Sequence, residues 1–165
     1  MPRRLIIMRH ARSAWGGAGS SDHERSLDER GRYEAPRVAT RLAERGWVPE
    51  AIHSSDARRT RETAELLMEA FAPAPSLTFD PDLYLAGLPA LCAAAQAWDP
   101  SWSTVLALGH NPGWQDAASS LCGSVLGMGT ANAVLLEARP GAPAGWSEAL
   151  LGEWSLVDVL RPEDL

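Results

Sequence analysis

Four consecutive apolar residues, Leu5 to Met8, lead directly into Arg9 and His10. So short a run does not fill a helix and is typical of a strand that is buried on both faces of a parallel sheet. Ligands of open α/β sheets bind at the carboxyl ends of the strands. An arginine fork matches phosphate oxygens and a neutral imidazole is a nucleophile, so this strand end suits a phosphate group. Taken alone, however, an Arg-His pair is more often a solvated strand end.

A second buried strand is expected over residues 104–109, and His110 follows it. Asn111 suits the N-cap of the next helix, and Pro112 suits its first position. His110 therefore stands on a strand-to-helix turn, where free backbone N–H groups favour an anion.

A third candidate site for an anion is the start of a helix expected over about residues 57–71. This helix follows a short strand at 51–55. We expect Ser55 or Asp56 to cap this helix. Its first turns hold three arginines, Arg58, Arg59 and Arg61. Cations are mildly unfavourable at the positive end of a helix dipole. A solvated basic face would explain any one of them, but the cluster favours a bound anion.

The charge of the chain is unevenly distributed. Thirteen of the fifteen cations, all of them arginine, lie in residues 1–61 together with eight acids, whereas residues 62–165 hold two cations and thirteen acids. An anion bound by the second half must therefore be neutralised by arginines from the first half. The net charge of -6 disfavours a nucleic-acid partner, which usually requires a basic stripe.

The remaining elements complete an α/β pattern. A long helix is expected after its N-cap, Asp28, with a kink or a later start caused by Pro36. Strands over 131–137 and 150–157 predict a hairpin-like edge of the sheet. The expected fold is a three-layer α/β/α sandwich, formed by a single domain over residues 1–165, with a mostly parallel sheet of about five or six strands.

Four motifs, taken in order, resemble the histidine phosphatase (phosphoglycerate mutase-like) superfamily, and within it the small SixA-like group of phosphohistidine phosphatases. The motifs are the Arg9-His10 pair and residues 22–31, 54–64 and 109–113. Together they are specific, although each alone is weak. The resemblance implies a phosphatase with a phosphoglycerate mutase-like fold.

The resemblance also implies a role for four residues. His10 would be the nucleophile that takes the phosphoryl group onto a ring nitrogen. Arg9 and Arg59 would hold the phosphoryl oxygens, and His110 would stabilise the group in transfer. Arginines and histidines then supply the positive charge that phosphoryl transfer needs, so no metal and no cofactor is expected.

Two further residues, Ser13 and Asn111, would complete the phosphate site. Arg59 rather than Arg58 matches the arginine of the family, because Arg59 lies four residues before Thr63.

The chain departs from the family in two ways. Ala11 replaces the glycine that usually follows the catalytic histidine, a change compatible with the SixA-like type. The position after the second histidine is Asn111, where the acid-phosphatase branch has an acid, and residues 83–85 hold no carboxylate where the mutase branch has one. The nearest candidates for a general acid are weak ones, Asp22, Asp80 and Asp82. A leaving alkoxide needs a proton from an acid, so this departure favours a substrate with a labile N–P bond.

Three functions fit these residues. The first is a metal-independent phosphatase that acts on phosphohistidine in a protein. The second is a phosphatase of small phosphorylated metabolites that uses the same site. The third is a non-catalytic phosphoprotein-binding module.

The cellular location is expected to be cytoplasmic. The apolar run after Arg4 is too short for a signal peptide or a membrane span, so no membrane partner is expected. Cys92 and Cys122 are interpreted as small core residues of a protein in a reducing compartment. Structural roles are also expected for His23 and His53.

Overall fold

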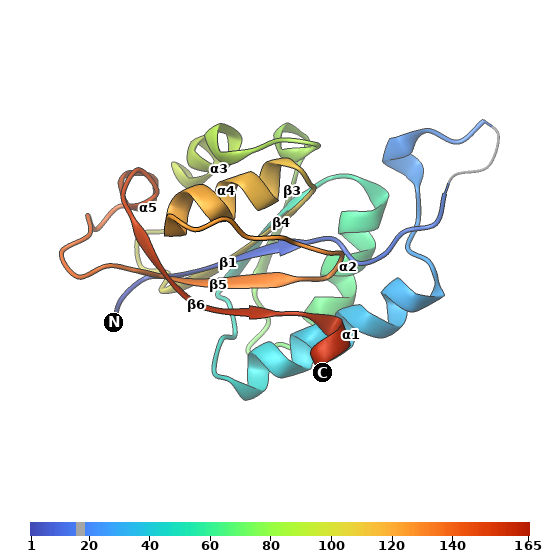
Figure 1. Ribbon diagram of the computed structural model, residues 1–165, viewed down its shortest axis with the longest axis horizontal. Coiled ribbons are helices and arrows are strands. Elements are labelled where there is room, and N and C mark those ends of the chain that lie inside the picture. The colour runs from blue at the N-terminus through green and yellow to red at the C-terminus, as the bar shows by residue number, and fades with distance from the viewer. Residues whose placement is uncertain (16–18) are drawn as a thin grey trace.

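A six-stranded sheet forms the centre of the computed structural model, which describes residues 1–15 and 19–165 (Figure 1). The strands are β1 (Arg4–Arg9), β2 (Ala51–Ser55), β3 (Ser76–Asp80), β4 (Thr104–Gly109), β5 (Ala133–Ala138) and β6 (Trp154–Leu160). In the order β3-β2-β4-β1-β5-β6 the first four are parallel to one another, β5 is antiparallel to β1, and β6 is antiparallel to β5. The expected mostly parallel sheet and its antiparallel edge are therefore confirmed.

Helices cover both faces of this sheet, as the three-layer fold requires. They are α1 (Glu29–Glu44), α2 (Arg58–Met68), α3 (Leu88–Ala95), α4 (Gly113–Cys122) and the short α5 (Trp146–Ala149). In Figure 1, α1 and α2 lie on one side of the sheet, and α3, α4 and α5 lie on the other. Within the part of the chain that the structure describes, no helix has both the length and the apolar character to cross a membrane.

The apolar residues of β1 pack into the cores under both helical layers. Leu5 and Ile7 are fully buried in the core beneath α3, α4 and α5, while Ile6 and Met8 are fully buried in the core beneath α1 and α2. Successive side chains of a strand point to opposite faces. A strand that is covered on both sides is therefore apolar at every position, which explains the unbroken run.

Helix α1 begins directly after Asp28, the N-cap expected from the sequence. Oδ1 of Asp28 accepts a hydrogen bond from the backbone N–H of Gly31 at 2.8 Å. Pro36 lies inside the helix, which nevertheless starts at Glu29, so of the two expected effects the later start is wrong and the kink stays a prediction. The buried apolar stripe that follows, with Val38 fully covered, offsets the cost of the proline.

Strands β1, β2 and β4 end at the same edge of the sheet. Their registers place Arg9 beside Gly109 and Ser54 beside Leu108. The residues that follow the three strands are thus neighbours in space, although they are far apart in sequence.

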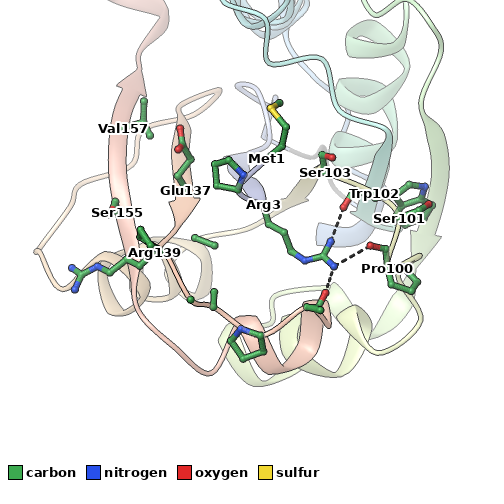
Figure 2. A pocket seen from close by; sticks show the side chains of 17 residues that line it. Met1, Arg3, Pro100, Ser101, Trp102, Ser103, Glu137, Arg139, Ser155 and Val157 are labelled. Carbon is green, nitrogen blue, oxygen red and sulfur yellow. Dashed lines mark hydrogen bonds between the residues drawn. The ribbon is translucent and has the colours of Figure 1, made fainter.

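The opposite edge of the sheet has a hollow of about 730 Å³ (Figure 2). Arg3 donates hydrogen bonds there to the carbonyl oxygens of Trp102 at 2.7 Å, of Pro100 at 2.9 Å and of Ala144. This guanidinium ties the loop before β4 to the loop after β5. Main-chain acceptors occupy three of its five N–H donors, so the role of Arg3 is structural.

Candidate active site

Two buried histidines meet a buried arginine at the carboxyl edge of the sheet. His10 follows β1, His110 follows β4, and Arg59 is the second residue of α2. Arg59 donates from Nε to Nε2 of His10 and from Nη2 to Nδ1 of His110, both at 3.3 Å. The two imidazole centroids lie 5.4 Å apart. The structure thus brings together three side chains that were expected from separate motifs.

The hydrogen bonds of His10 determine which ring nitrogen carries its proton. Nδ1 lies 2.7 Å from the carbonyl oxygen of Ala11, which can only accept, so Nδ1 carries the hydrogen. Nε2 accepts from Arg59 and is therefore unprotonated. In this tautomer Nε2 is the nitrogen that can attack phosphorus.

His110 is held in the other tautomer. Its Nδ1 faces a donor on Arg59, so the proton is on Nε2, which donates to Oγ of Ser55 at 2.7 Å. The expectation that Ser55 or Asp56 caps α2 is wrong, because the N-cap position is Ala57 and no side chain caps it. Instead, the hydroxyl of Ser55 orients an imidazole.

Burial keeps both histidines neutral at pH 7. It lowers the pKa of His10 from 6.5 to about 4, and the charges of Arg59 and Arg9 add to this effect. Burial likewise lowers the pKa of His110 to about 3, with further contributions from His10 and Arg59. The nucleophile is therefore unprotonated over the whole neutral range.

We expect His10 to titrate near pH 4 rather than near its ordinary value. NMR titration of the ring signals, assigned with a His10→Gln variant, measures this. Because the folded pKa lies below the unfolded one, the unfolded chain takes up protons first as the pH falls. The free energy of unfolding should then decrease from about pH 6.5 towards pH 4, by up to roughly 1.4 kcal/mol per pH unit for each buried histidine. Titration of His10 near 6.5 would contradict the buried neutral pair.

Arg9 brings a second guanidinium to this edge. Its Nη1 donates to the carbonyl oxygen of Met128 at 3.1 Å, and its buried Nε has no hydrogen-bond partner among the described residues. Burial, together with the charge of Arg59, lowers the pKa of Arg9 below its ordinary value. A guanidinium that is only partly paired in this position has donors left for an anion.

Asp22 places a carboxylate at the site. Its Oδ2 accepts from Nη2 of Arg59 at 3.0 Å and from the hydroxyl of Tyr84, and its Oδ1 accepts from Arg25 at 2.9 Å. The hydrogen bond from Tyr84, supported by those from Arg25 and Arg59, holds the pKa of Asp22 well below its usual range. Asp22 is therefore ionised at neutral pH.

The sequence did not identify Arg25 and Tyr84 as site residues. The ring of Tyr84 packs edge-on against His110 with centroids 5.4 Å apart, and the charge of Arg25 acts on His10. Arg25 lies in the motif at 22–31, but one residue of an irregular segment has no periodicity that would single it out.

Thr63 aligns α2 with the nucleophile. Its Oγ1 accepts from the backbone N–H of Ala11 at 3.1 Å and donates to the carbonyl oxygen of Arg59 at 2.7 Å. The spacing of four residues that selected Arg59 is thus one helical turn, which places both residues on the face of α2 beside His10.

Comparison with known proteins assigns this arrangement to a family. The family model described as Histidine phosphatase superfamily (branch 1) matches residues 5–84. The chloroplastic uncharacterized protein At3g52155 of Arabidopsis thaliana is 37% identical, over 98% of this chain and 78% of its own length. The chain belongs to the histidine phosphatase superfamily.

Two other relatives of this histidine phosphatase carry more specific names. The crystal structure of SixA from Agrobacterium tumefaciens matches with a TM-score of 0.81 at 29% identity, covering 98% of this chain and 99% of that one. The 2,3-bisphosphoglycerate-dependent phosphoglycerate mutase of Streptomyces griseus is 34% identical over 42% of this chain and 28% of the mutase. The SixA-like resemblance and the phosphatase class expected from the sequence are confirmed.

Two expected phosphate ligands of this histidine phosphatase have other partners. Oγ of Ser13 accepts from Arg25 at 2.6 Å. The amide of Asn111 donates to the carbonyl oxygen of Met128 at 2.8 Å and accepts from the N–H of Gln115 at 3.2 Å. Ser13 and Asn111 thus brace the walls of the site, and direct contact of either with phosphate stays a prediction.

The three candidate general acids occupy different places. Asp80 accepts from Nε2 of His53 at 2.8 Å and from the N–H of Asp82 at 2.9 Å, and Asp82 is exposed. Asp22 lies at the site, but an ionised carboxylate has no proton to donate to a leaving group. In this arrangement none of the three carboxyl groups is both at the site and protonated, so none can protonate a leaving group.

The other two histidines lie outside the reacting pair. His53 accepts from the indole N–H of Trp98 at 2.9 Å and bonds to Asp80, which fits the structural role expected for it. His23 bonds to Oδ1 of Asp56 at 3.0 Å and packs edge-on against Tyr84 with centroids 4.9 Å apart. His23 therefore supports the tyrosine that covers His110.

Gly113 lets α4 approach the segment that carries Tyr84. Helix α4 starts at this glycine, with Pro112 at the N-cap, one residue later than expected. A Cβ on Gly113 would lie 2.6 Å from the carbonyl carbon of Ala86.

The Gly113→Ala variant should lose about 1–3 kcal/mol of unfolding free energy through overpacking. The matched Gly127→Ala variant meets no atom within 4 Å and should stay within about 0.5 kcal/mol. Denaturant unfolding of both variants checks this, and equal stabilities would contradict it.

Proposed function

We propose that this histidine phosphatase is metal-independent, works through a phosphohistidine intermediate on His10, and acts on phosphohistidine in a protein. The observation that carries the proposal is the neutral His10 imidazole, with Nδ1 bound to the Ala11 carbonyl and unprotonated Nε2 facing Arg59. The relation to SixA, which is named a phosphohistidine phosphatase, supports the substrate class. The third expected function, a binding module without catalysis, is disfavoured because the nucleophile is in place.

The reaction proceeds in two displacements. Nε2 of His10 attacks phosphorus, the bond to the leaving group breaks, and the leaving group departs with the electron pair. Water then attacks the phosphorus of the phosphorylated His10, the P–Nε2 bond breaks, and inorganic phosphate leaves while Nε2 recovers its lone pair. Arg9 and Arg59 neutralise the phosphoryl oxygens. His110 can donate to them from Nδ1 once Arg59 releases this nitrogen and the ring takes the tautomer in which Nε2 accepts from the Ser55 hydroxyl.

The leaving group distinguishes the substrate classes. A phosphohistidine that is protonated on its free ring nitrogen releases a neutral imidazole, which needs no acid from the enzyme. An alkoxide from a sugar phosphate needs a proton, and the carboxylate of Asp22 does not hold one. The site therefore favours N–P over O–P bonds.

A small phosphorylated metabolite is the second candidate substrate. The similarity to phosphoglycerate mutases over 42% of the chain favours it, because mutases act on phosphate esters. The cytoplasmic location stays a prediction, and the Arabidopsis relative is chloroplastic.

A substrate panel in the presence of a chelator tests the proposal. A phosphohistidine-carrying protein should lose its phosphate at a far higher kcat/KM than sugar phosphates do, and EDTA should not change the rate. Robust hydrolysis of sugar phosphates, with no action on the phosphorylated protein, would decide for the metabolite substrate. Loss of activity in EDTA, restored by a divalent cation, would contradict metal independence.

A further inference from the structure

The Asp22 carboxylate is bound by groups that would suit a phosphate. Arg25 reaches one of its oxygens, while Arg59 and the Tyr84 hydroxyl reach the other. Two guanidinium groups and one hydroxyl around a planar anion are the donors that also bind phosphoryl oxygens.

Asp22 also uses most of the hydrogen-bonding capacity of Arg59. The guanidinium has five N–H donors. Nε donates to His10, Nη1 donates to the carbonyl oxygen of Asp22 at 2.7 Å, and Nη2 donates to both the Asp22 carboxylate and His110. One N–H, on Nη1, is left. In this arrangement Arg59 cannot hold a phosphate with two parallel hydrogen bonds unless it gives up at least one of these partners, and Asp22 takes two of the four bonds.

The same arrangement covers the nucleophile. Nε of Arg59 donates to Nε2 of His10, so the lone pair that must attack phosphorus is occupied by a hydrogen bond. Asp22 fixes the other end of the same guanidinium. Releasing Arg59 from Asp22 would let it turn towards a phosphate and free Nε2.

Asp22 is placed to leave without disturbing the core. Nearly half of its side chain is exposed, 46%, whereas Arg59 is only 3% exposed. The short helix η1 (Asp22–Glu24) that carries it has no buried residue. Arg59 is buried in the protein, whereas Asp22 lies on an exposed segment. When the two separate, the carboxylate of Asp22 is therefore the group that moves.

We propose that Asp22 is a built-in competitor of the substrate, whose carboxylate occupies the outer part of the phosphate site and is exchanged for the phosphoryl group when substrate binds. This inference rests on the proposed function and adds a residue that sets the affinity of the site for phosphate. The arginines stay paired with a negatively charged group during the exchange, because the phosphoryl group takes the place of the Asp22 carboxylate.

Titration calorimetry with inorganic phosphate tests the exchange without any turnover. The Asp22→Asn variant should bind phosphate about tenfold more tightly or better than the wild type, because its amide competes weakly for arginine. Asp82→Asn is the matched control, since Asp82 is an exposed carboxylate outside the site, and its affinity should stay within about twofold; this separates displacement from a general change in net charge. A melting curve of each variant confirms that it is folded.

Three results would overturn the proposal. Weaker phosphate binding by Asp22→Asn would mean that Asp22 positions Arg59 for the phosphate instead of competing with it. Unchanged binding would mean that phosphate does not displace the carboxylate. A loss of turnover on phosphate esters alone, with unchanged phosphate affinity, would make Asp22 the general acid. If phosphate binds the variant more tightly but no substrate turns over, the proposed function fails and the competition stands.

Discussion

Replacing His10 by alanine should lower kcat/KM for the phosphohistidine substrate by about 10,000-fold or more, as removal of a nucleophile does in other enzymes with covalent intermediates. His110 carries the other unprotonated nitrogen at the site, Nδ1, which likewise accepts from Arg59, but its ring centroid lies 5.4 Å from that of His10, so it cannot take the position of Nε2 of His10. Steady-state kinetics on the purified variant measures the loss.

His53→Gln is the matched control for His10→Ala. His53 is also buried, at 8% exposure against 6% for His10, but it bonds to Asp80 and Trp98 rather than to Arg59. It should retain activity within a few-fold if it is folded, as circular dichroism would show. Turnover that persists in His10→Ala would remove the covalent mechanism.

Replacing Arg59 by alanine should cost roughly a hundred- to a thousand-fold in kcat/KM, the range found when one donor to a developing negative charge is removed. Arg59 is the one described side chain that contacts His10, His110 and Asp22 together. Arg59→Lys should recover little, because an ammonium group cannot reproduce a planar fork that meets three partners.

The neighbouring arginine supplies the control for Arg59. The side chain of Arg58 is 52% exposed and pairs with Glu62 at 3.6 Å on the surface of α2, a contact worth little to stability. Arg58→Ala should therefore keep its kcat/KM within about twofold. Equal losses in the two variants would mean that the basic start of α2 acts through its summed charge, and not through the contacts of Arg59.

The parts of the site that follow buried strands could be predicted from the sequence. Strands β1 and β4 are covered on both faces and are almost entirely apolar, so their ends are marked by the first polar residues, His10 and His110 among them. Arg59 could be selected from the three arginines because the resemblance to the family places its arginine four residues before Thr63. Each of these signals is local in the sequence. The parallel strands then bring the residues together, because their carboxyl ends lie at one edge of the sheet.

The residues that the sequence missed depend on contacts between irregular segments. Arg25 and Tyr84 were missed, and both bind Asp22, Tyr84 across 62 positions of sequence. Asp22 itself was expected only as a weak candidate for the general acid, because nothing in its neighbours marks where a loop will fold. Ser55 was expected to cap a helix, but it bonds to His110 because a hydroxyl can serve either partner and only the tertiary structure decides. Asn111 was expected at the N-cap of α4, which Pro112 occupies, although Oδ1 of Asn111 still accepts from the N–H of Gln115 in the first turn. Its contact with phosphate stays a prediction.

The most direct measurement is to trap the enzyme with substrate by rapid quenching without acid and to locate the phosphate by ³¹P NMR and peptide mass spectrometry. The tautomer of His10 predicts a phosphate on Nε2 of this residue, formed and lost at rates compatible with kcat. A phosphate on Nδ1, on any other residue, or on none during turnover would contradict the assignment of His10 as the nucleophile.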